Sequence, residues 1–331
     1  MDSLDPKLVT VFGGSGFVGT QIVQLLARNG HRVRVAVRRP DLAGHLRTLG
    51  TVGQIVPVQA NIRNDASIQR AVAGVDIVIN LVGIAANRGA QTFDAVHTDG
   101  AAAIARAAKA AGVTQLVHMS ALGVDKAAEV SRYAASKLAG EEAVLAAFPE
   151  AIVMRPSLLF GPGDGFFNLM GTLARLLPVM PVIAGKTLFQ PAYVGDVAQA
   201  FVLAAEGKLK PGKIYELGGP QVETHRQLLE RVLHEAMRKR PLLPVPSGLA
   251  KFKAALLGIL PFPPLVTPDQ VELLGVDNVV SEAAIKDKRT LAGMGIVPTS
   301  MDTILPGYMW RFRKHGQFDK TAPAAVEQES L

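Results

Sequence analysis

The stretch Val9-Thr10-Val11-Phe12-Gly13-Gly14-Ser15-Gly16-Phe17-Val18-Gly19 decides the fold of this chain. An apolar run typical of a strand enters a glycine turn, and an amphipathic helical pattern follows at once, with Gly30 as its stop signal. The glycines fit G-x-G-x-x-G at 14, 16 and 19, and G-x-x-G-x-x-G at 13, 16 and 19. In such a turn the glycines permit the bend, let backbone approach a pyrophosphate, and let the helix pack on its strand. The stretch therefore predicts a dinucleotide site, whereas a lone match would indicate only an ordinary strand-to-helix turn.

The composition suits a large α/β protein and excludes several kinds of site. Of the 331 residues, 49% are hydrophobic and 19% are charged, which is enough apolar sequence for a large core. Cysteine is absent, so disulfides, thiolate metal sites and a cysteine nucleophile are excluded. The seven histidines show no metal-ligand spacing, and we expect no metal. The net charge of +7 fits an anionic cofactor, anionic lipid or an acidic partner; without a nucleic-acid-binding motif, we expect no nucleic acid.

The N-terminal segment and the hydropathy pattern predict a cytoplasmic protein. Residues 1–6 are polar and acidic, and they lack the basic and apolar regions of a signal peptide. No stretch reaches the ~18 uninterrupted apolar residues of a membrane-spanning helix. The nearest, residues 254–266, is interrupted by three prolines. Peripheral contact with a membrane stays compatible with this pattern.

Apolar β-branched runs alternate with helical patterns through the first half of the chain, which predicts a parallel sheet covered by helices. We expect a Rossmann-type doubly wound α/β fold with a smaller, mainly helical C-terminal lobe. The expected strands are residues 9–12, 32–37, 54–59, 75–82, 115–119, 151–155 and 213–217. We expect residues 1–160 to form the dinucleotide-binding domain, with segments near 190–217 returning to it, and residues 161–318 to form a discontinuous lobe for a substrate or partner. Residues 319–331 read as a disordered tail.

The end of the second expected strand favours NADP(H) over NAD(H). An NAD site usually places an acid there for the ribose 2′-hydroxyl. This chain has Arg38 and Arg39 instead, and a guanidinium suits a 2′-phosphate bidentately. The alternative is solvated charge at a strand end.

Tyr133 and Lys137 lie one helical turn apart, so their side chains share a face. A tyrosine has a pKa of about 10, and a nearby ammonium lowers that pKa. The pair is therefore a candidate for proton exchange near neutral pH. His118, at the end of a buried strand, reads as a core histidine rather than a ligand.

Several motifs occur together in the order that is typical of one enzyme family. The glycine turn is followed by Asn80-Leu81-Val82-Gly83, by Tyr133-x-x-x-Lys137, and by Arg155-Pro156-x-x-x-Phe160-Gly161-Pro162-Gly163. With these motifs the chain resembles the extended short-chain dehydrogenase/reductases from about residue 7 to 215. Val37-Arg38-Arg39 and His118-Met119-Ser120-Ala121 make it similar, more narrowly, to the atypical branch that contains the nucleotide-binding accessory alpha-subcomplex subunits of respiratory complex I.

The resemblance implies roles for individual residues. It makes Tyr133 the general acid/base, and it gives Lys137 a tuning role and a hydrogen bond to the nicotinamide ribose. A hydroxyl after the fifth strand would polarise a substrate carbonyl; Ser120 is the candidate, although the needed position falls on Ala121 in another alignment. A backbone-bonded hydroxyl is the structural alternative for Ser120. The predicted cofactor-binding residues are Gly13, Gly14, Ser15, Gly16, Phe17, Val18, Gly19, Arg38, Arg39, Asn61, Ile62, Leu81, Val82, Gly83, Tyr133, Lys137 and Pro156.

Two functions are compatible with these residues. One is an NADP(H)-binding accessory or assembly subunit of the respiratory NADH:quinone oxidoreductase, with a mainly structural nucleotide, at the cytoplasmic face of the inner membrane. The other is a free NADP(H)-dependent reductase, dehydrogenase or epimerase; a nucleotide-sensing regulator is a weaker third. Residues 249–266 carry apolar side chains mostly on one helical face, and they read either as a core helix or as a docking element for a partner or lipid surface.

Overall fold

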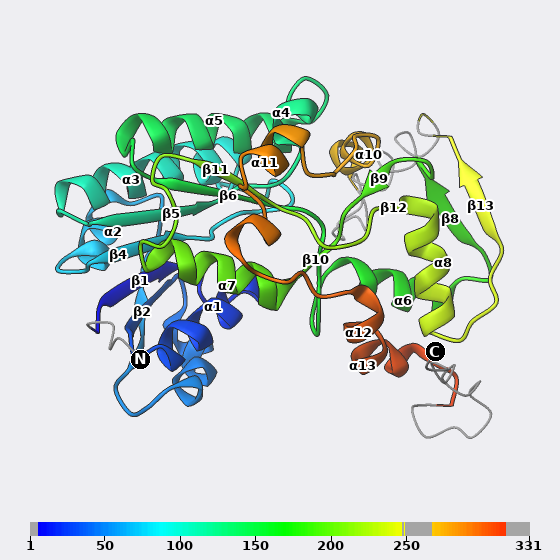
Figure 1. Ribbon diagram of the computed structural model, residues 1–331, viewed down its shortest axis with the longest axis horizontal. Helices are drawn as coiled ribbons and strands as arrows, with labels where there is room; N and C mark the ends of the chain where they lie inside the picture. Colours follow the sequence, from blue (N-terminus) through cyan, green and yellow to red (C-terminus); the bar gives the residue numbers. More distant parts are fainter. Residues whose placement is uncertain (1–5, 247, 249–266, 316–331) are drawn as a thin grey trace.

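The computed structural model describes residues 6–246, 248 and 267–315, which are built around a seven-stranded sheet (Figure 1). The strand order is β11-β6-β5-β4-β1-β2-β3, and every pairing in it is parallel. The strands are β1 (Leu8–Phe12), β2 (Arg32–Val37), β3 (Ile55–Gln59), β4 (Ile77–Asn80), β5 (Gln115–Met119), β6 (Ile152–Pro156) and β11 (Ile214–Leu217). The predicted doubly wound α/β fold is confirmed. The order reverses between β1 and β4, which is where such sheets bind ligands.

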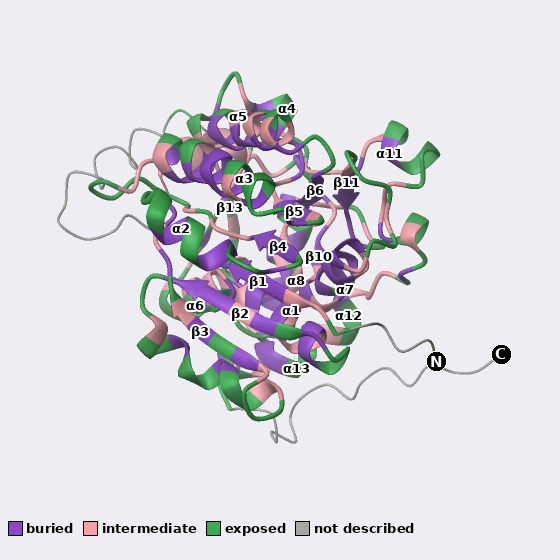
Figure 2. Cartoon of the chain, turned by 90° about the vertical axis from the view of Figure 1, so that its left-hand side faces the viewer, coloured by how far each residue is buried: buried purple, intermediate pink, exposed green. Residues whose placement is uncertain are grey.

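Helices cover both faces of the sheet (Figure 1). One face carries α1 (Phe17–Arg28) and α7 (Val194–Ala205); the other carries α2 (Asp65–Val72), α3 (Gly100–Ala110) and α5 (Arg132–Ala147). Side chains alternate along β1 to serve both layers, since Val9 and Val11 pack with α1 and α7 whereas Phe12 packs with α2 and α3. Figure 2 shows the central strands buried and the outward helix faces exposed. Burial on both faces explains why the strands are continuous apolar runs in the sequence.

The helical segment between β4 and β5 does not begin as a regular α-helix. A π-helical turn, η2 (Asp94–Asp99), precedes α3. The carbonyl of His97 in this turn lies so close to Gly140 on α5 that a Cβ on Gly140 would overlap it. The two helices therefore meet backbone to backbone, with Gly140 as the residue that allows the contact.

The remaining elements of the first half are short. A 3₁₀ segment, η1 (Pro40–Leu49), connects β2 to β3, and α4 (Val124–Ala127) precedes α5. The edge strand β11 is covered by chain from the C-terminal part, because Glu216 N donates to the Arg289 carbonyl at 2.9 Å. The Arg289 guanidinium in turn donates to the carbonyl of Ile214 at 2.6 Å. This pairing protects an otherwise open sheet edge.

A smaller, mainly helical lobe lies beside the sheet at the right of Figure 1. Its apolar centre includes Phe160, Phe167, Leu228 and Phe312. Two C-terminal elements, α11 (Glu282–Lys286) and the 3₁₀ turn η3 (Ala292–Met294), lie against the sheet rather than in this lobe (Figure 1), and Leu291 and Ile296 on either side of η3 join the core under the sheet. The helices of the lobe are α6 (Phe166–Leu176), α8 (His225–Glu235), α10 (Pro268–Leu273), α12 (Met301–Ile304) and α13 (Pro306–Met309), with the 3₁₀ turn η4 (Trp310–Phe312). Three small strand pairs support them, β7 (Leu159–Phe160) with β10 (Ala192–Tyr193), β9 (Leu188–Phe189) with β12 (Glu223–Thr224), and β8 (Met180–Ile183) with β13 (Leu242–Val245).

Two predicted features lie outside the described residues. They are the amphipathic segment at 249–266 and the tail at 319–331, so their predictions stay open. Within the part of the chain that the structure describes, no helix has the length and apolarity needed to cross a membrane.

Candidate functional site

The glycine turn brings the start of α1 against the carboxyl end of β1. Gly13 has a φ of +78°, which a residue with a side chain adopts at a cost. A Cβ on Gly14 would lie 2.9 Å from a methyl of Val35, and one on Gly19 would lie 2.6 Å from the Gly14 Cα. These three glycines are therefore required by the fold itself.

Gly16 is different, because no contact with the described part of the chain requires a glycine there. Its φ of −80° and ψ of 179° are open to any residue. The nearest heavy atom to an added Cβ would be the Gly13 carbonyl oxygen at 3.4 Å, an ordinary contact, and the residue is exposed. Gly16 is the N-cap residue of α1 and makes no side-chain capping hydrogen bond, so the N–H groups of the first turn are left without a side-chain cap. A missing side chain at the positive end of a helix is the arrangement that admits a phosphate.

A cavity of about 730 Å³ opens at this turn, between the carboxyl ends of β1, β2, β3 and β4. It is lined by Gly13, Ser15, Gly16, Ala36, Val37, Arg38, Arg39, Leu42, Ala60, Asn61, Ile62, Arg63, Leu81, Val82, Gly83, Ile84, Gln91 and Val96. Among the described residues, the charged side chains that line it are three exposed arginines, Arg38, Arg39 and Arg63. The cavity therefore suits a ligand with several negative charges.

Most of the predicted cofactor-binding residues line this cavity, and the others lie elsewhere. Gly14 and Gly19 pack beneath it and Val18 is in the core. Phe17 lies under the turn at Gly161, and Pro156 is buried in β6, where it pairs with Leu217. Tyr133 and Lys137 are also outside the lining. Contact of any of these residues with a cofactor stays a prediction.

Sequence reasoning missed several lining residues, of which Arg63 and Gln91 are the most polar. Arg63 directly follows Asn61 and Ile62 at the end of β3, so its position was a usable signal. Gln91 had none, because its place depends on how the loop after β4 returns. The Arg38 guanidinium donates to Gln91 Oε1 at 2.6 Å, and Arg63 donates to the Ala90 carbonyl at 3.1 Å. Both arginines thus hold this loop across the mouth of the site.

The Tyr133–Lys137 pair lies on α5, but its surroundings differ from the expectation. Burial, and secondly the Asp269 carboxylate, raise the pKa of Tyr133 to about 12, so the predicted lowering by Lys137 is wrong in this structure. Lys137 is buried, and its ammonium donates to the Met119 carbonyl at 2.5 Å. Burial lowers the pKa of Lys137 to about 8, opposed by Glu141.

Asp269 holds the start of α5 from the small lobe. Its carboxylate accepts from the Arg132 and Tyr133 backbone N–H groups at 2.6 and 3.2 Å, and from the Ser131 hydroxyl at 3.0 Å. A carboxylate at a helix N-terminus is favourable, and here it joins the two lobes beside Tyr133.

Two buried polar groups at the end of β5 have no hydrogen-bond partner among the described residues, His118 Nε2 and Ser120 Oγ. A backbone hydrogen bond therefore does not account for the Ser120 hydroxyl in the part of the chain described. The other ring nitrogen of His118 accepts from the Asn80 amide at 3.1 Å, so His118 is half-satisfied within the core. Burial first, then the charge of Lys137, lower its pKa well below 6.5.

A further histidine, His97, was not singled out by its sequence. It is buried in η2, and its two ring nitrogens contact the Ile84 amide and the Ser136 hydroxyl. Burial, and secondly Lys137, lower its pKa to about 3.

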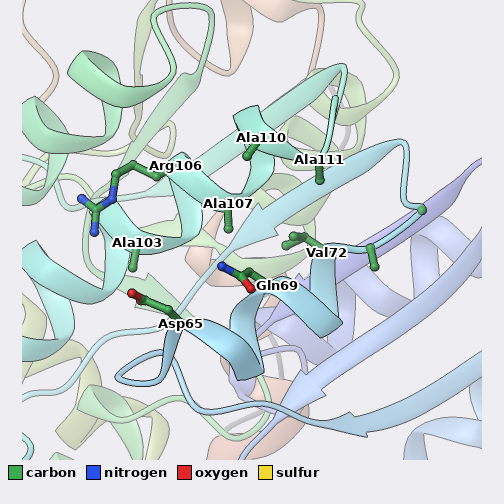
Figure 3. A pocket seen from close by; sticks show the side chains of 10 residues that line it. Asp65, Gln69, Val72, Ala103, Arg106, Ala107, Ala110 and Ala111 are labelled. Carbon is green, nitrogen blue, oxygen red and sulfur yellow. The ribbon is translucent and has the colours of Figure 1, made fainter.

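A second hollow, of about 520 Å³, runs along the outer surface between α2 and α3 (Figure 3). Alanine and valine side chains form most of its wall, and Asp65, Gln69 and Arg106 are its long polar side chains. It lacks the glycine turn and the strand ends that make the first cavity the candidate nucleotide site. Among the described residues, no group of His, Asp and Glu side chains is placed to hold a metal ion.

Residues 9–218 match the NAD dependent epimerase/dehydratase family. The chain belongs to this family. The matched region contains the glycine turn, all seven strands of the sheet except the first residue of β1, and the Tyr133–Lys137 pair. The motifs of the sequence predicted this membership among the extended short-chain dehydrogenase/reductases, and that prediction is confirmed.

Comparison with individual proteins extends the relation over nearly the whole chain. The chain is 35% identical over 328 residues to "NADH dehydrogenase [ubiquinone] 1 alpha subcomplex subunit 9, mitochondrial" of Arabidopsis thaliana, covering 95% of this chain and 80% of the relative. It is also 35% identical over 195 residues to "Ceramide reductase" of Caulobacter vibrioides, covering 59% and 60%. Among solved structures, the NADPH complex of the quinone oxidoreductase QOR2 from Escherichia coli superposes with a TM-score of 0.69 at 19% identity, over 91% of this chain and 98% of that one. The last comparison shows the fold alone.

Two glycine variants should distinguish a glycine that the fold requires from a glycine that nucleotide binding requires. Gly19→Ala should lower the free energy of unfolding by ~1–3 kcal/mol, because its Cβ pushes α1 off the turn. Gly16→Val should change that free energy by at most ~1 kcal/mol, the loss of a favourable N-cap residue. It should nevertheless abolish the rise in melting temperature that nucleotide produces. Urea unfolding and thermal melts check both; retained nucleotide protection in Gly16→Val would show that the cavity is misassigned.

The buried histidines should make the protein less stable in mild acid. The native pKa of His97 is about 3, whereas an unfolded histidine has a pKa near 6.5. Below pH 6.5 the His97 imidazole is therefore protonated in the unfolded chain but stays neutral in the native chain, so the free energy of unfolding falls as the pH drops. One such group contributes roughly 2 kcal/mol between pH 7 and pH 5. Urea unfolding at both pH values should show a pH dependence that is smaller by this amount in His97→Gln; equal dependence in the two proteins would contradict the assignment.

Proposed function

We propose that the chain is an NADP(H)-binding accessory or assembly subunit of a respiratory NADH:quinone oxidoreductase, in which the nucleotide is mainly structural. The near full-length similarity to the Arabidopsis alpha subcomplex subunit carries this proposal. Its partners are then subunits of that membrane-bound enzyme. Its place is the cytoplasmic face of the inner membrane, where lipid contact would be peripheral.

The cavity fits the nucleotide that this function needs. Gly16 and the free N–H groups of α1 would receive the pyrophosphate. Arg38 and Arg39 would receive the 2′-phosphate, with Arg63 adding positive charge on the neighbouring wall. The bound nucleotide would supply a hydride carrier, and any ligand bound only to the native state also stabilises the fold.

The surroundings of Tyr133 support a structural role for the nucleotide. Proton exchange near pH 7 is efficient when the pKa of the acid or base lies near the working pH, and the pKa of Tyr133 is about 12. The Lys137 ammonium is engaged by the Met119 carbonyl, and position 121, after Ser120, is an alanine without a hydroxyl. The binding half of the site is thus better formed than the reacting half.

A free NADP(H)-dependent reductase is the second candidate. The observation that favours it is the buried Lys137, whose pKa near 8 lies close to neutral pH, one turn from Tyr133. The similarity to a protein named as a ceramide reductase, over the shorter length given above, points the same way.

Arg38→Asp should discriminate between the two nucleotides. One lost charge-assisted hydrogen bond is worth about 1.5–3 kcal/mol, or roughly ten- to a hundredfold in affinity. NADPH binding should fall by this factor while NADH binding changes much less, as isothermal titration would measure. Equal losses for both nucleotides would refute the 2′-phosphate assignment. The exposed arginine Arg32, at the opposite end of β2, is the matched control, and Arg32→Asp should leave the preference unchanged.

Gentle extraction of the membrane complex should recover this chain together with its nucleotide. Mass spectrometry of the complex, from cells that express the chain at its own level, should find it in near-stoichiometric amount. Tyr133→Phe should keep both association and nucleotide if the nucleotide is structural. A chain missing from the complex, with NADPH oxidation across a carbonyl panel lost in Tyr133→Phe, would favour the free reductase instead.

A further inference from the structure

One wall of the nucleotide cavity is held from behind by a histidine. Gly83 and Ile84 form this wall after β4. The backbone N–H of Ile84 donates to His97 Nε2 at 3.0 Å. A Cβ on Gly83 would lie 3.5 Å from the same nitrogen, so the ring sits directly against the wall. His97 as a whole residue is only 1% exposed, which keeps its ring out of reach of solvent.

The other edge of the ring faces the helix that carries Tyr133 and Lys137. His97 Nδ1 lies 2.9 Å from Ser136 Oγ, and the Ser136 hydroxyl donates to the Tyr133 carbonyl at 2.8 Å. Because the Ile84 N–H is a donor, Nε2 must be the acceptor, and the proton of the neutral ring must sit on Nδ1. The hydrogen bonds therefore run in one direction, from Ile84 through His97 and Ser136 to Tyr133.

The ring is also fixed by packing. It stacks on Phe93 with ring centroids 5.6 Å apart and 17° between the planes. Tyr133 meets it edge-on at 5.3 Å and 90°. On the backbone side, Gly140 admits the His97 carbonyl against α5. Neither ring rotation nor helix sliding is available without breaking one of these contacts.

The neutral form of the His97 imidazole is the form that can make both hydrogen bonds. A protonated ring would place an N–H against the Ile84 N–H and lose that hydrogen bond. Burial in the first place, and the Lys137 ammonium in the second, keep the pKa of His97 at about 3, so the ring is neutral near pH 7.

We propose that His97 is a positioning residue for the nucleotide, which ties the Gly83–Ile84 wall of the cavity to helix α5 through a neutral imidazole bridge. The inference rests on the proposed nucleotide binding and deepens it. The wall lies beside the glycine turn, since a Cβ on Gly13 would lie 3.4 Å from both the backbone nitrogen and a methyl of Val82. Loss of the bridge should therefore weaken NADPH and NADH equally, unlike a change at Arg38.

The test compares three variants of the full chain by isothermal titration with each nucleotide. His97→Phe keeps a flat ring between Phe93 and Tyr133 but makes neither hydrogen bond; NADPH and NADH affinity should both fall about tenfold, the effect of one or two buried hydrogen bonds. His97→Gln can accept from Ile84 and donate to Ser136, and it should restore affinity to within about threefold of the original. Ser136→Ala removes only the second bond and should cost about two- to threefold.

A spectroscopic measurement accompanies the titrations. Long-range ¹H–¹⁵N spectra of the unchanged protein at pH 7 should show one histidine in the Nδ1–H tautomer whose signals vanish in His97→Phe. Near-ultraviolet circular dichroism confirms folding; if His97→Phe fails to fold, Ser136→Ala and His97→Gln still carry the comparison.

The outcomes separate this inference from the proposed function. Nucleotide binding by the unchanged chain with full affinity in His97→Phe, or equal loss in His97→Phe and His97→Gln, would overturn the bridge alone. No binding of either nucleotide by the unchanged chain would overturn the nucleotide proposal and the bridge with it.

Discussion

The contact between α1 and the glycine turn is the constraint on which the rest of the site depends. A Cβ on Gly19 would lie 2.6 Å from the Gly14 Cα and would separate the helix from the turn, and a Cβ on Gly14 would lie 2.9 Å from a methyl of Val35 on β2. This contact starts α1 directly at the carboxyl end of β1, the strand that pairs with β2 and β4 on its two sides. The ends of β2, β3 and β4 then meet around the first turn of the helix, and the cavity follows from that meeting. Its positive character comes from a second source, the arginines at the ends of β2 and β3.

The strand ends are the part of the site that the sequence could predict. Parallel strands bury both faces, so their apolar runs are long enough to locate, and β5 begins and ends at the predicted residues. Once the strands are located, the residues that follow them are expected to converge on one edge, and Arg38, Asn61 and Leu81 do line the cavity there. Their contact with a cofactor stays a prediction. The loop that brings Gln91 to the cavity gives no such signal, and neither does the π-helical turn that places His97, because both depend on packing against distant segments.

The same limit explains the error about Tyr133. Helical spacing predicts that Tyr133 and Lys137 share a face of α5, and it says nothing about what packs there. In the fold, a carboxylate from position 269 reaches the start of α5, and the Met119 carbonyl takes a hydrogen bond from the Lys137 ammonium. Burial and that carboxylate together outweigh any help from the lysine, so the pKa moves up instead of down. The pKa of Tyr133 thus depends on a contact with a residue 136 positions away in the sequence, and a local motif cannot predict such a contact.

Binding and reaction are physically separable in this site. In the proposed complex the glycine turn, the helix start and the arginines would hold phosphate groups independently of the other end of the nucleotide, whereas turnover would need a correctly placed tyrosine, lysine and hydroxyl. A ligand present at a hundred times its Kd adds about 2.7 kcal/mol to the native state, a large share of a typical stability of ~5–15 kcal/mol. A chain that keeps the first set of residues and loosens the second still gains that stabilisation. Its surface also becomes more rigid. The nucleotide would bind at the junction of β1, β2 and β4, next to the cavity wall. His97 connects that wall to α5, and Asp269 connects α5 to the small lobe. A structural nucleotide is therefore a sufficient physical reason for the glycine turn to persist in a subunit whose proposed work is assembly.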